Sequence, residues 1–246
     1  MPGTKLEIKT ADGVADAWAF HPKSGGKALP VIMFPDALGV RAALKDMAEH
    51  LSGQGFFVLL PNIFYRMGDF APFDAKTAFS NPSERERVMK IARSLDAESA
   101  KKDTQAYLDA IAAQPHLGAS KVGTMGYCMG GRLAYMAAAN FPDRVGAAAG
   151  FHAGHLVTDQ PDSPHLLADK VKARLYFGVA DNDQGCTPEM QGKLAAAFGA
   201  AHLAYQIELY PHAMHGFAVT DTPVFSKAAQ DQHWDRAISL FRAGLQ

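Results

Sequence analysis

One six-residue segment, Gly-Tyr-Cys-Met-Gly-Gly at 126–131, most constrains how this chain can fold. It follows a short apolar run at 121–125 and precedes a helical pattern at 132–140, which predicts a strand that turns directly into a helix. In so tight a turn, a Cβ atom two positions before or after the central residue would collide with a crossing element, which explains the flanking glycines. The segment therefore predicts that the thiol of Cys128 lies at a helix N-terminus, which favours a thiolate and an oxyanion.

A cysteine between glycines can also be a small buried residue at a strand end. Whether Cys128 is a nucleophile therefore depends on the pattern of the rest of the chain. A hairpin over 5–20, with Asp12-Gly13 at its turn, precedes a buried strand at 31–35. Later strands are expected at 56–60, 121–125, 145–151, 174–179 and 204–210, and helices at 42–54, 97–113, 132–140, 188–200 and 228–241. This alternation predicts one α/β domain over residues 1–246, with a doubly wound, mostly parallel sheet and functional residues at the C-terminal ends of its strands. Two long segments, 62–83 and 152–169, follow strands and should line or cover that edge.

Composition excludes several classes of partner. The chain has 24 basic and 25 acidic residues, and this balance lacks the excess of positive charge expected of a protein that binds nucleic acid or an anionic membrane surface. The first ten residues lack a secretory signal pattern, and no apolar run approaches the roughly 20 residues of a membrane span. With only two cysteines, a reducing cytoplasm is the expected location. Neither a catalytic metal nor another cofactor is expected, because no dedicated ligand cluster completes the four loop histidines His152, His155, His212 and His215.

An activated thiol needs a base, and the base needs an acid that fixes its tautomer. The chain supplies them in the order nucleophile, acid, histidine, which is typical of an α/β-hydrolase fold with a nucleophile elbow. Asp181 is preferred over Asp183 as the acid because it lies closer to the end of its strand, although either residue could instead serve a turn or a cap. His215 is preferred over His212 as the base because it is followed by Gly-Phe, a turn that can expose an imidazole.

Two backbone amides are predicted to form the oxyanion hole. One belongs to Met129, directly after the nucleophile, and the other to Ala37, in the turn after the strand at 31–35. Asp36 in the same turn would place a carboxylate near the thiol, or would simply cap the turn. His152 follows a strand directly and either lines the pocket or packs within its loop.

The chain resembles the dienelactone hydrolase family of α/β-hydrolases from about residue 31 to its C-terminus. The resemblance rests on the segments 36–40, 54–56, 61–64, 126–131 and 215–217 and on the loop containing Asp181. It implies a hydrolase whose catalytic triad is Cys128, Asp181 and His215, with Ala37 and Met129 as oxyanion donors.

Departures from the family pattern concern the substrate. Members that open dienelactone have a glutamate where this chain has Asp36, and they bind the substrate carboxylate with two arginines. Arg85 matches the first arginine, with Arg87 as an alternative and an exposed helix face as the other interpretation. Val219 occupies the second position, so half of the anion clamp is missing unless Arg66 or His152 replaces it. The resemblance thus implies Asp36 and Arg85 as substrate-binding residues and predicts weak turnover of dienelactone. His152, from its place directly after a strand, is a third candidate substrate-binding residue.

The sequence therefore predicts a hydrolase of small esters or lactones that works through a thioester on Cys128. A second possibility is a hydrolase of less polar substrates, favoured by Val219 and by the aromatic residues at the inferred mouth, Phe64, Tyr65, Phe70, Phe73 and Phe217. A third is a ligand binder or thiol sensor that has lost turnover.

Overall fold

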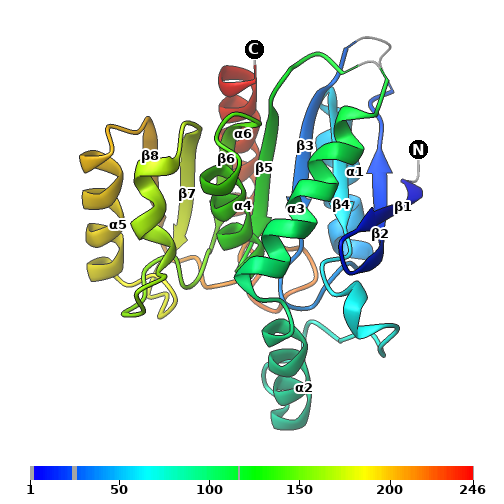
Figure 1. The fold of residues 1–246 in the computed structure, drawn as a ribbon. Coiled ribbons are helices and arrows are strands. Elements are labelled where there is room, and N and C mark those ends of the chain that lie inside the picture. Colours follow the sequence, from blue (N-terminus) through cyan, green and yellow to red (C-terminus); the bar gives the residue numbers. More distant parts are fainter. Residues whose placement is uncertain (1–2, 24–26, 116, 246) are drawn as a thin grey trace.

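The computed structural model describes residues 3–23, 27–115 and 117–245. Within these ranges eight strands form one sheet in the order β1-β2-β4-β3-β5-β6-β7-β8 (Figure 1). The strands are β1 Thr4–Thr10, β2 Gly13–Phe20, β3 Leu29–Phe34, β4 Phe56–Pro61, β5 Val122–Tyr127, β6 Val145–Phe151, β7 Arg174–Ala180 and β8 Tyr205–Tyr210. Strand β2 is antiparallel to both of its neighbours, and all other neighbouring strands are parallel. The predicted doubly wound, mostly parallel sheet and the hairpin at Asp12-Gly13 are confirmed.

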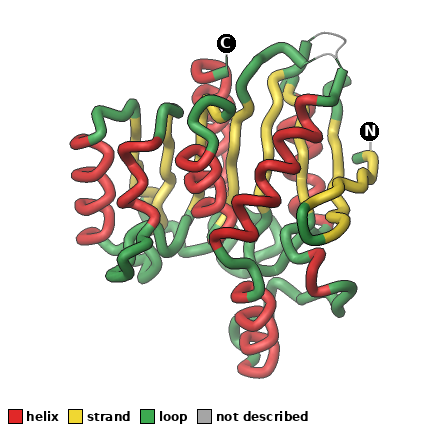
Figure 2. Tube along the Cα trace, viewed as in Figure 1, coloured by secondary structure: helices red, strands yellow, loops and turns green. Residues whose placement is uncertain are grey.

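Helices cover both faces of the sheet (Figures 1 and 2). They are α1 Ala42–Gly53, α2 Pro82–Arg93, α3 Ala97–Ala112, α4 Met129–Asn140, α5 Pro188–Ala200 and α6 Lys227–Gly244, together with the short 3-10 helices η1 Tyr65–Met67 and η2 Pro164–Lys170. Helices α1 and α6 bury apolar side chains in the core on one face, and α3, α4 and α5 do so on the other. None of the described helices is both long and apolar enough to cross a membrane.

Two elements differ from the sequence prediction. Strand β5 continues to Tyr127 and helix α4 begins at Met129, so Cys128 alone connects a strand predicted to end at 125 with a helix predicted to begin at 132. The second difference is α2, whose first residues lie within the predicted long loop at 62–83. Figure 1 shows α2 extending away from the body of the fold, beyond the edge where the strands end.

The C-terminal ends of the parallel strands meet along one edge. Pairing continues to the last residues of β5, β6 and β7 and of their neighbours, with the register pairs Phe34↔Gly126, Tyr127↔Phe151, Phe151↔Gly178 and Ala180↔Tyr210. Loops gather at this edge (Figure 2). The segments that carry the predicted chemistry are therefore neighbours in space although they are far apart in sequence.

Candidate active site

Cys128 occupies the tight turn between β5 and α4. It is the N-cap residue of α4, has a φ of 54°, and is a free, partly exposed cysteine. A Cβ atom on Gly126 would lie 2.2 Å from the carbonyl carbon of Gly130, and one on Gly130 would lie 2.4 Å from the carbonyl oxygen of Pro35. The predicted steric need for glycine on both sides of the nucleophile is confirmed.

His215 lies beside Cys128 and is held by Asp183. The Nδ1 atom of His215 is 2.7 Å from Oδ2 of Asp183, whose side chain is almost fully buried. The other carboxylate oxygen of Asp183 accepts a hydrogen bond of 2.8 Å from the amide of Gly185. A carboxylate fixed in this way selects the tautomer and the orientation of the imidazole ring, which is what a catalytic base requires.

The expectation that Asp181 orients this histidine is wrong. The carboxylate of Asp181 accepts a hydrogen bond of 3.2 Å from the backbone amide of His212, and its own amide donates to the carbonyl of Ala213. Asp181 therefore serves the turn at the end of β7. The next residue, Asn182, has a φ of 54° and reverses the chain, so that Asp183 points inward and becomes buried. The aspartate closer to the end of β7 is therefore not the one that contacts His215, because the left-handed conformation of Asn182 turns the next aspartate, Asp183, towards the histidine.

The environment of His215 favours the protonated ring. Burial by itself lowers the pKa of His215, but hydrogen bonds with Asp183 and with Cys128, together with the charges of both groups, raise it to about 10. At neutral pH the imidazole can therefore hold a proton beside the sulfur of Cys128. This arrangement is typical of activated cysteine nucleophiles.

The predicted oxyanion turn follows β3. The amide of Leu38 donates to Oδ1 of Asp36 at 2.9 Å, while the amide of Ala37 donates to no other described residue. The amide of Met129 belongs to the first turn of α4, where backbone N–H groups have no partner within the helix. Both predicted donors, Ala37 and Met129, line the same cavity as Cys128.

Asp36 is tied to Arg41, which makes it an unsuitable substrate ligand. Two nitrogens of Arg41 lie 2.7 and 2.9 Å from the two carboxylate oxygens of Asp36. Arg41 also bonds both oxygens of Asp221, at 2.7 and 3.0 Å. Burial lowers the pKa of Arg41, but the two carboxylates outweigh this effect and raise it. The network joins the oxyanion turn to the loop that follows His215.

His152 is buried at the wall of the site. Its side chain is 1% exposed, and neither ring nitrogen has a hydrogen-bond partner among the described residues. Its ring centroid lies 5.1 Å from that of His215 and 5.2 Å from that of Phe217. Burial, followed by the nearby charges of His215 and His233, lowers the pKa of His152 well below its usual value. The ring is therefore neutral, with a nitrogen free to donate and another free to accept.

Two cavities meet at the nucleophile and the histidine. One, of about 790 Å³, extends between the loops after β7 and β8, and Asp181, Asn182, Gln184 and His212 lie in its wall. The other, of about 830 Å³, extends towards α2 and is mainly apolar; its wall includes Leu38, Ala75, Phe79, Met89, Ala92, Leu95 and Val224. Cys128, Met129, His155 and His215 line both cavities.

Arg85, predicted to bind the substrate, is exposed on α2 and does not line either cavity. Its alternative, Arg87, bonds Glu84 and the carbonyl of Ala71. The direction of α2 explains this, because the helix turns Met89 and Arg93 towards the cavity and not Arg85 or Arg87. Val219, at the position of the second arginine, is fully buried in the core.

The aromatic residues expected at the mouth also lie elsewhere. Phe64, Phe73 and Phe217 are buried in the core, and Phe70 packs against it. The hydroxyl of Tyr65 bonds Asp103, and Arg66 is paired with Asp12 and Asp103, so Arg66 does not replace the missing arginine.

Sequence reasoning missed a different set of cations in the larger cavity, namely Lys76, Arg93 and Arg132. A signal for Arg132 was present, because it is four residues after Cys128 and such residues share one face of a helix. No sequence signal distinguishes Lys76 and Arg93 from other surface cations, since their position depends on how α2 and its preceding loop fold over the sheet edge.

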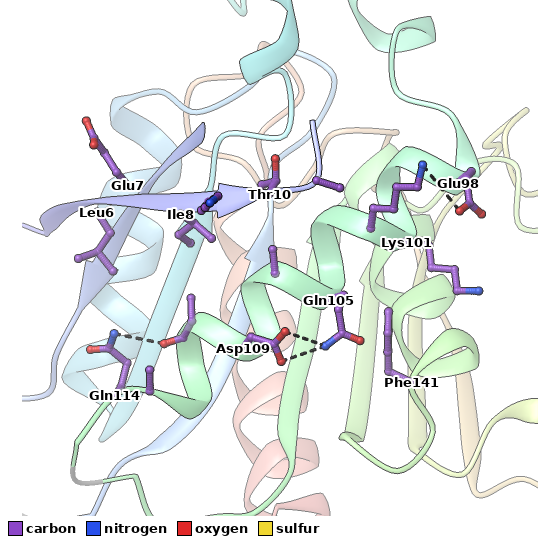
Figure 3. A pocket seen from close by; sticks show the side chains of 16 residues that line it. Leu6, Glu7, Ile8, Thr10, Glu98, Lys101, Gln105, Asp109, Gln114 and Phe141 are labelled. Atoms are coloured by element: carbon purple, nitrogen blue, oxygen red, sulfur yellow. Dashed lines mark hydrogen bonds and ion pairs between the residues drawn. The ribbon is translucent and has the colours of Figure 1, made fainter. Parts of the chain in front are cut away.

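A groove between β1 and α3 lies away from this site (Figure 3). It has a volume of about 680 Å³ and contains none of the predicted functional residues. The polar side chains of Gln105 and Asp109 in its wall bond each other at 2.9 Å. This groove therefore plays no part in the chemistry at Cys128.

A tight strand-to-helix turn carrying a nucleophile, followed in the chain by a buried acid and a histidine at the same sheet edge, defines an α/β-hydrolase. Solved structures agree on the fold. The chain superposes with a TM-score of 0.78 on a dienelactone hydrolase-like promiscuous phosphotriesterase from metagenomic libraries, which is 22% identical, with 100% of each chain covered. It superposes with a TM-score of 0.70 on an acylaminoacyl peptidase of Pyrococcus horikoshii, which is 15% identical, over 99% of this chain and 42% of that one.

Residues 15–245 match the dienelactone hydrolase family, and the chain belongs to this family. Among its relatives is a carboxymethylenebutenolidase of Pseudomonas putida, 26% identical over 242 residues, which covers 98% of this chain and 96% of the relative. The carboxymethylenebutenolidase of Pseudomonas knackmussii matches with the same identity and coverage. The resemblance inferred from the motifs is thereby confirmed.

Proposed function

We propose that this protein hydrolyses small esters or lactones, with Cys128 as the nucleophile, His215 as the acid and base, and Asp183 as the residue that orients His215. The observation that carries the proposal is the 2.7 Å contact between Asp183 and His215 beside a thiol at a helix N-terminus. The family's activity on ester and lactone bonds supports it. The thiol, which must stay reduced to act, favours the cytoplasm as the place of work.

In the acylation step, the Sγ atom of Cys128 attacks the substrate carbonyl carbon as a thiolate. The amides of Ala37 and Met129 stabilise the negative charge that develops on the carbonyl oxygen. His215 then gives its proton to the leaving alkoxide as the carbon–oxygen bond breaks. A thioester, a neutral imidazole and an alcohol result, and in a lactone the alcohol stays tethered to the acyl group.

In the second step, His215 takes a proton from water, and the hydroxide attacks the thioester. The carbon–sulfur bond breaks, and the thiolate and the protonated ring are restored. The high pKa of His215 suits this cycle, because the ring must hold a proton whenever the sulfur is anionic. We also propose that His152 contacts the substrate, because its two buried ring nitrogens have no described partner.

The proposal predicts a covalent intermediate. An activated aryl ester should give a burst of phenol followed by a slower steady rate, and mass spectrometry of the quenched protein should find the acyl group on Cys128. The variant Cys128→Ala should show neither, whereas Cys186→Ala is the matched control, because Cys186 is buried and burial raises its pKa to about 11. Turnover without an acyl adduct on Cys128 would reject the cysteine mechanism.

A further inference from the structure

Arg132 stands on the helix that begins at the nucleophile. Cys128 is the N-cap of α4 and Arg132 follows it by four residues, so both side chains lie on one face of the helix. Arg132 and Cys128 line the same cavity, together with the predicted oxyanion donor Ala37. A group bound by Arg132 would therefore lie close to the carbonyl that Cys128 attacks.

The guanidinium of Arg132 has no carboxylate partner. In the part of the chain that the structure describes, the other arginines that are at least partly buried each bond an acidic side chain; they are Arg41, Arg66, Arg87 and Arg144. Arg132 is also partly buried, yet it forms no hydrogen bond or ion pair with a described residue. Burial lowers the pKa of Arg132, and only the charge of Cys128 opposes this effect. Arginine has five donors in a planar fork that matches a planar oxyanion.

The charged side chains of the cavity wall also favour an anionic ligand. Apart from the reacting pair Cys128 and His215, the wall contains three cationic side chains, those of Arg132, Lys76 and Arg93, and one acidic side chain, that of Asp36. Both oxygens of Asp36 are bonded by Arg41, so this carboxylate is already compensated. The cavity thus combines apolar walls with an excess of positively charged side chains outside the reacting pair, which attracts an anionic ligand.

We propose that Arg132 is the anion-binding residue of this site and selects esters or lactones that carry a carboxylate or a similar planar oxyanion near the scissile carbonyl. The inference rests on the proposed function and gives the substrate class of the same site. It assigns the anion contact to α4, and not to Arg85 on α2 or to the position of Val219. A bidentate contact would satisfy a guanidinium that the protein itself leaves unpaired.

The test compares a charged substrate with its neutral analogue. The mono-4-nitrophenyl ester of adipic acid and the same molecule with its free carboxylate methylated share one leaving group and nearly one shape. The ratio of their specificity constants should favour the free acid in the parent protein. It should fall at least about tenfold in Arg132→Gln, as expected for the loss of a charged bidentate contact. Arg132→Lys should retain part of the preference, and Arg85→Gln, the matched control on α2, should retain all of it.

A ratio of specificity constants that Arg132→Gln leaves unchanged would overturn the inference. If both constants also fell by the same factor, the result would mean that Arg132 acts on the thiolate or on the fold.

A binding measurement separates this inference from the proposed reaction. Adipate should bind to Cys128→Ala, and the double variant Cys128→Ala/Arg132→Gln should bind it at least about tenfold more weakly. Loss of turnover of both esters in the parent, with this difference in binding preserved, would reject the proposed reaction and keep the anion site. Equal binding of adipate by the single and the double variant would reject the anion site even if both esters are hydrolysed.

Discussion

Replacing Asp183 by asparagine tests the acid that the structure selects. The substitution keeps the shape of a buried side chain but removes the charge 2.7 Å from Nδ1 of His215. The new amide can also donate to Nδ1, which would favour the tautomer that cannot act on the thiol. Asp181→Asn is the matched control, because Asp181 accepts one hydrogen bond of 3.2 Å from the His212 amide and does not contact the histidine ring.

Two effects contribute to the fall in kcat that we expect for Asp183→Asn. A hydrogen bond to a charged partner contributes about 1.5–3 kcal/mol, which corresponds to roughly 10- to 150-fold in rate. The wrong tautomer adds to this, so that kcat should fall by about 10³ to 10⁴. In Asp181→Asn we expect a change below about threefold, since only one weak contact in a turn is altered.

The assay is kcat and kcat/KM for an activated aryl ester, measured from pH 5 to 11 with circular dichroism as the control for folding. Because Asp183 raises the pKa of His215 in the free protein, its loss should move the alkaline limb of the kcat/KM profile from about pH 10 towards lower pH. Because folding raises the pKa of His215, protonation of its ring stabilises the folded protein. The stabilisation from the protonated ring is fully present below the unfolded value of about 6.5 and is lost as the pH rises through about 10. A larger loss of kcat in Asp181→Asn than in Asp183→Asn would refute this reasoning.

Two further predictions concern the frame of the site. Gly130→Ala should cost ~1–3 kcal/mol of folding free energy in urea unfolding and lower kcat, because its Cβ would lie 2.4 Å from a backbone oxygen of the oxyanion turn. Gly192→Ala on α5, where a Cβ meets nothing within 4 Å, should instead stabilise by ~0.5–1 kcal/mol, and an equal cost at both positions would contradict the steric argument. Arg41→Met should cost about 3 kcal/mol, since it leaves the buried carboxylate of Asp36 without its cation, and adding Asp36→Asn should restore part of that loss. An unchanged urea midpoint in Arg41→Met would show that the network adds nothing to stability.

Local patterns determined the scaffold of this protein. Alternating apolar runs and helical periodicity predicted the parallel sheet, because the period of a buried strand or an amphipathic helix is a property of neighbouring residues. The glycines around Cys128 predicted the elbow for the same reason, since their need arises within one short turn. The position of His215 was also predictable, and the contact with an aspartate beside it supports that choice.

Only the tertiary structure decided which charged side chains meet. The left-handed residue Asn182 turns Asp183 and not Asp181 towards His215. The spacing of residues along the chain does not predict this change of backbone direction. The direction of α2 leaves Arg85 in solvent, while α4 brings Arg132 into the cavity beside Cys128. A pattern in sequence fixes which residues are near along the chain, but the partners of a charge depend on helix direction and loop rotation. These follow from packing across the whole sheet.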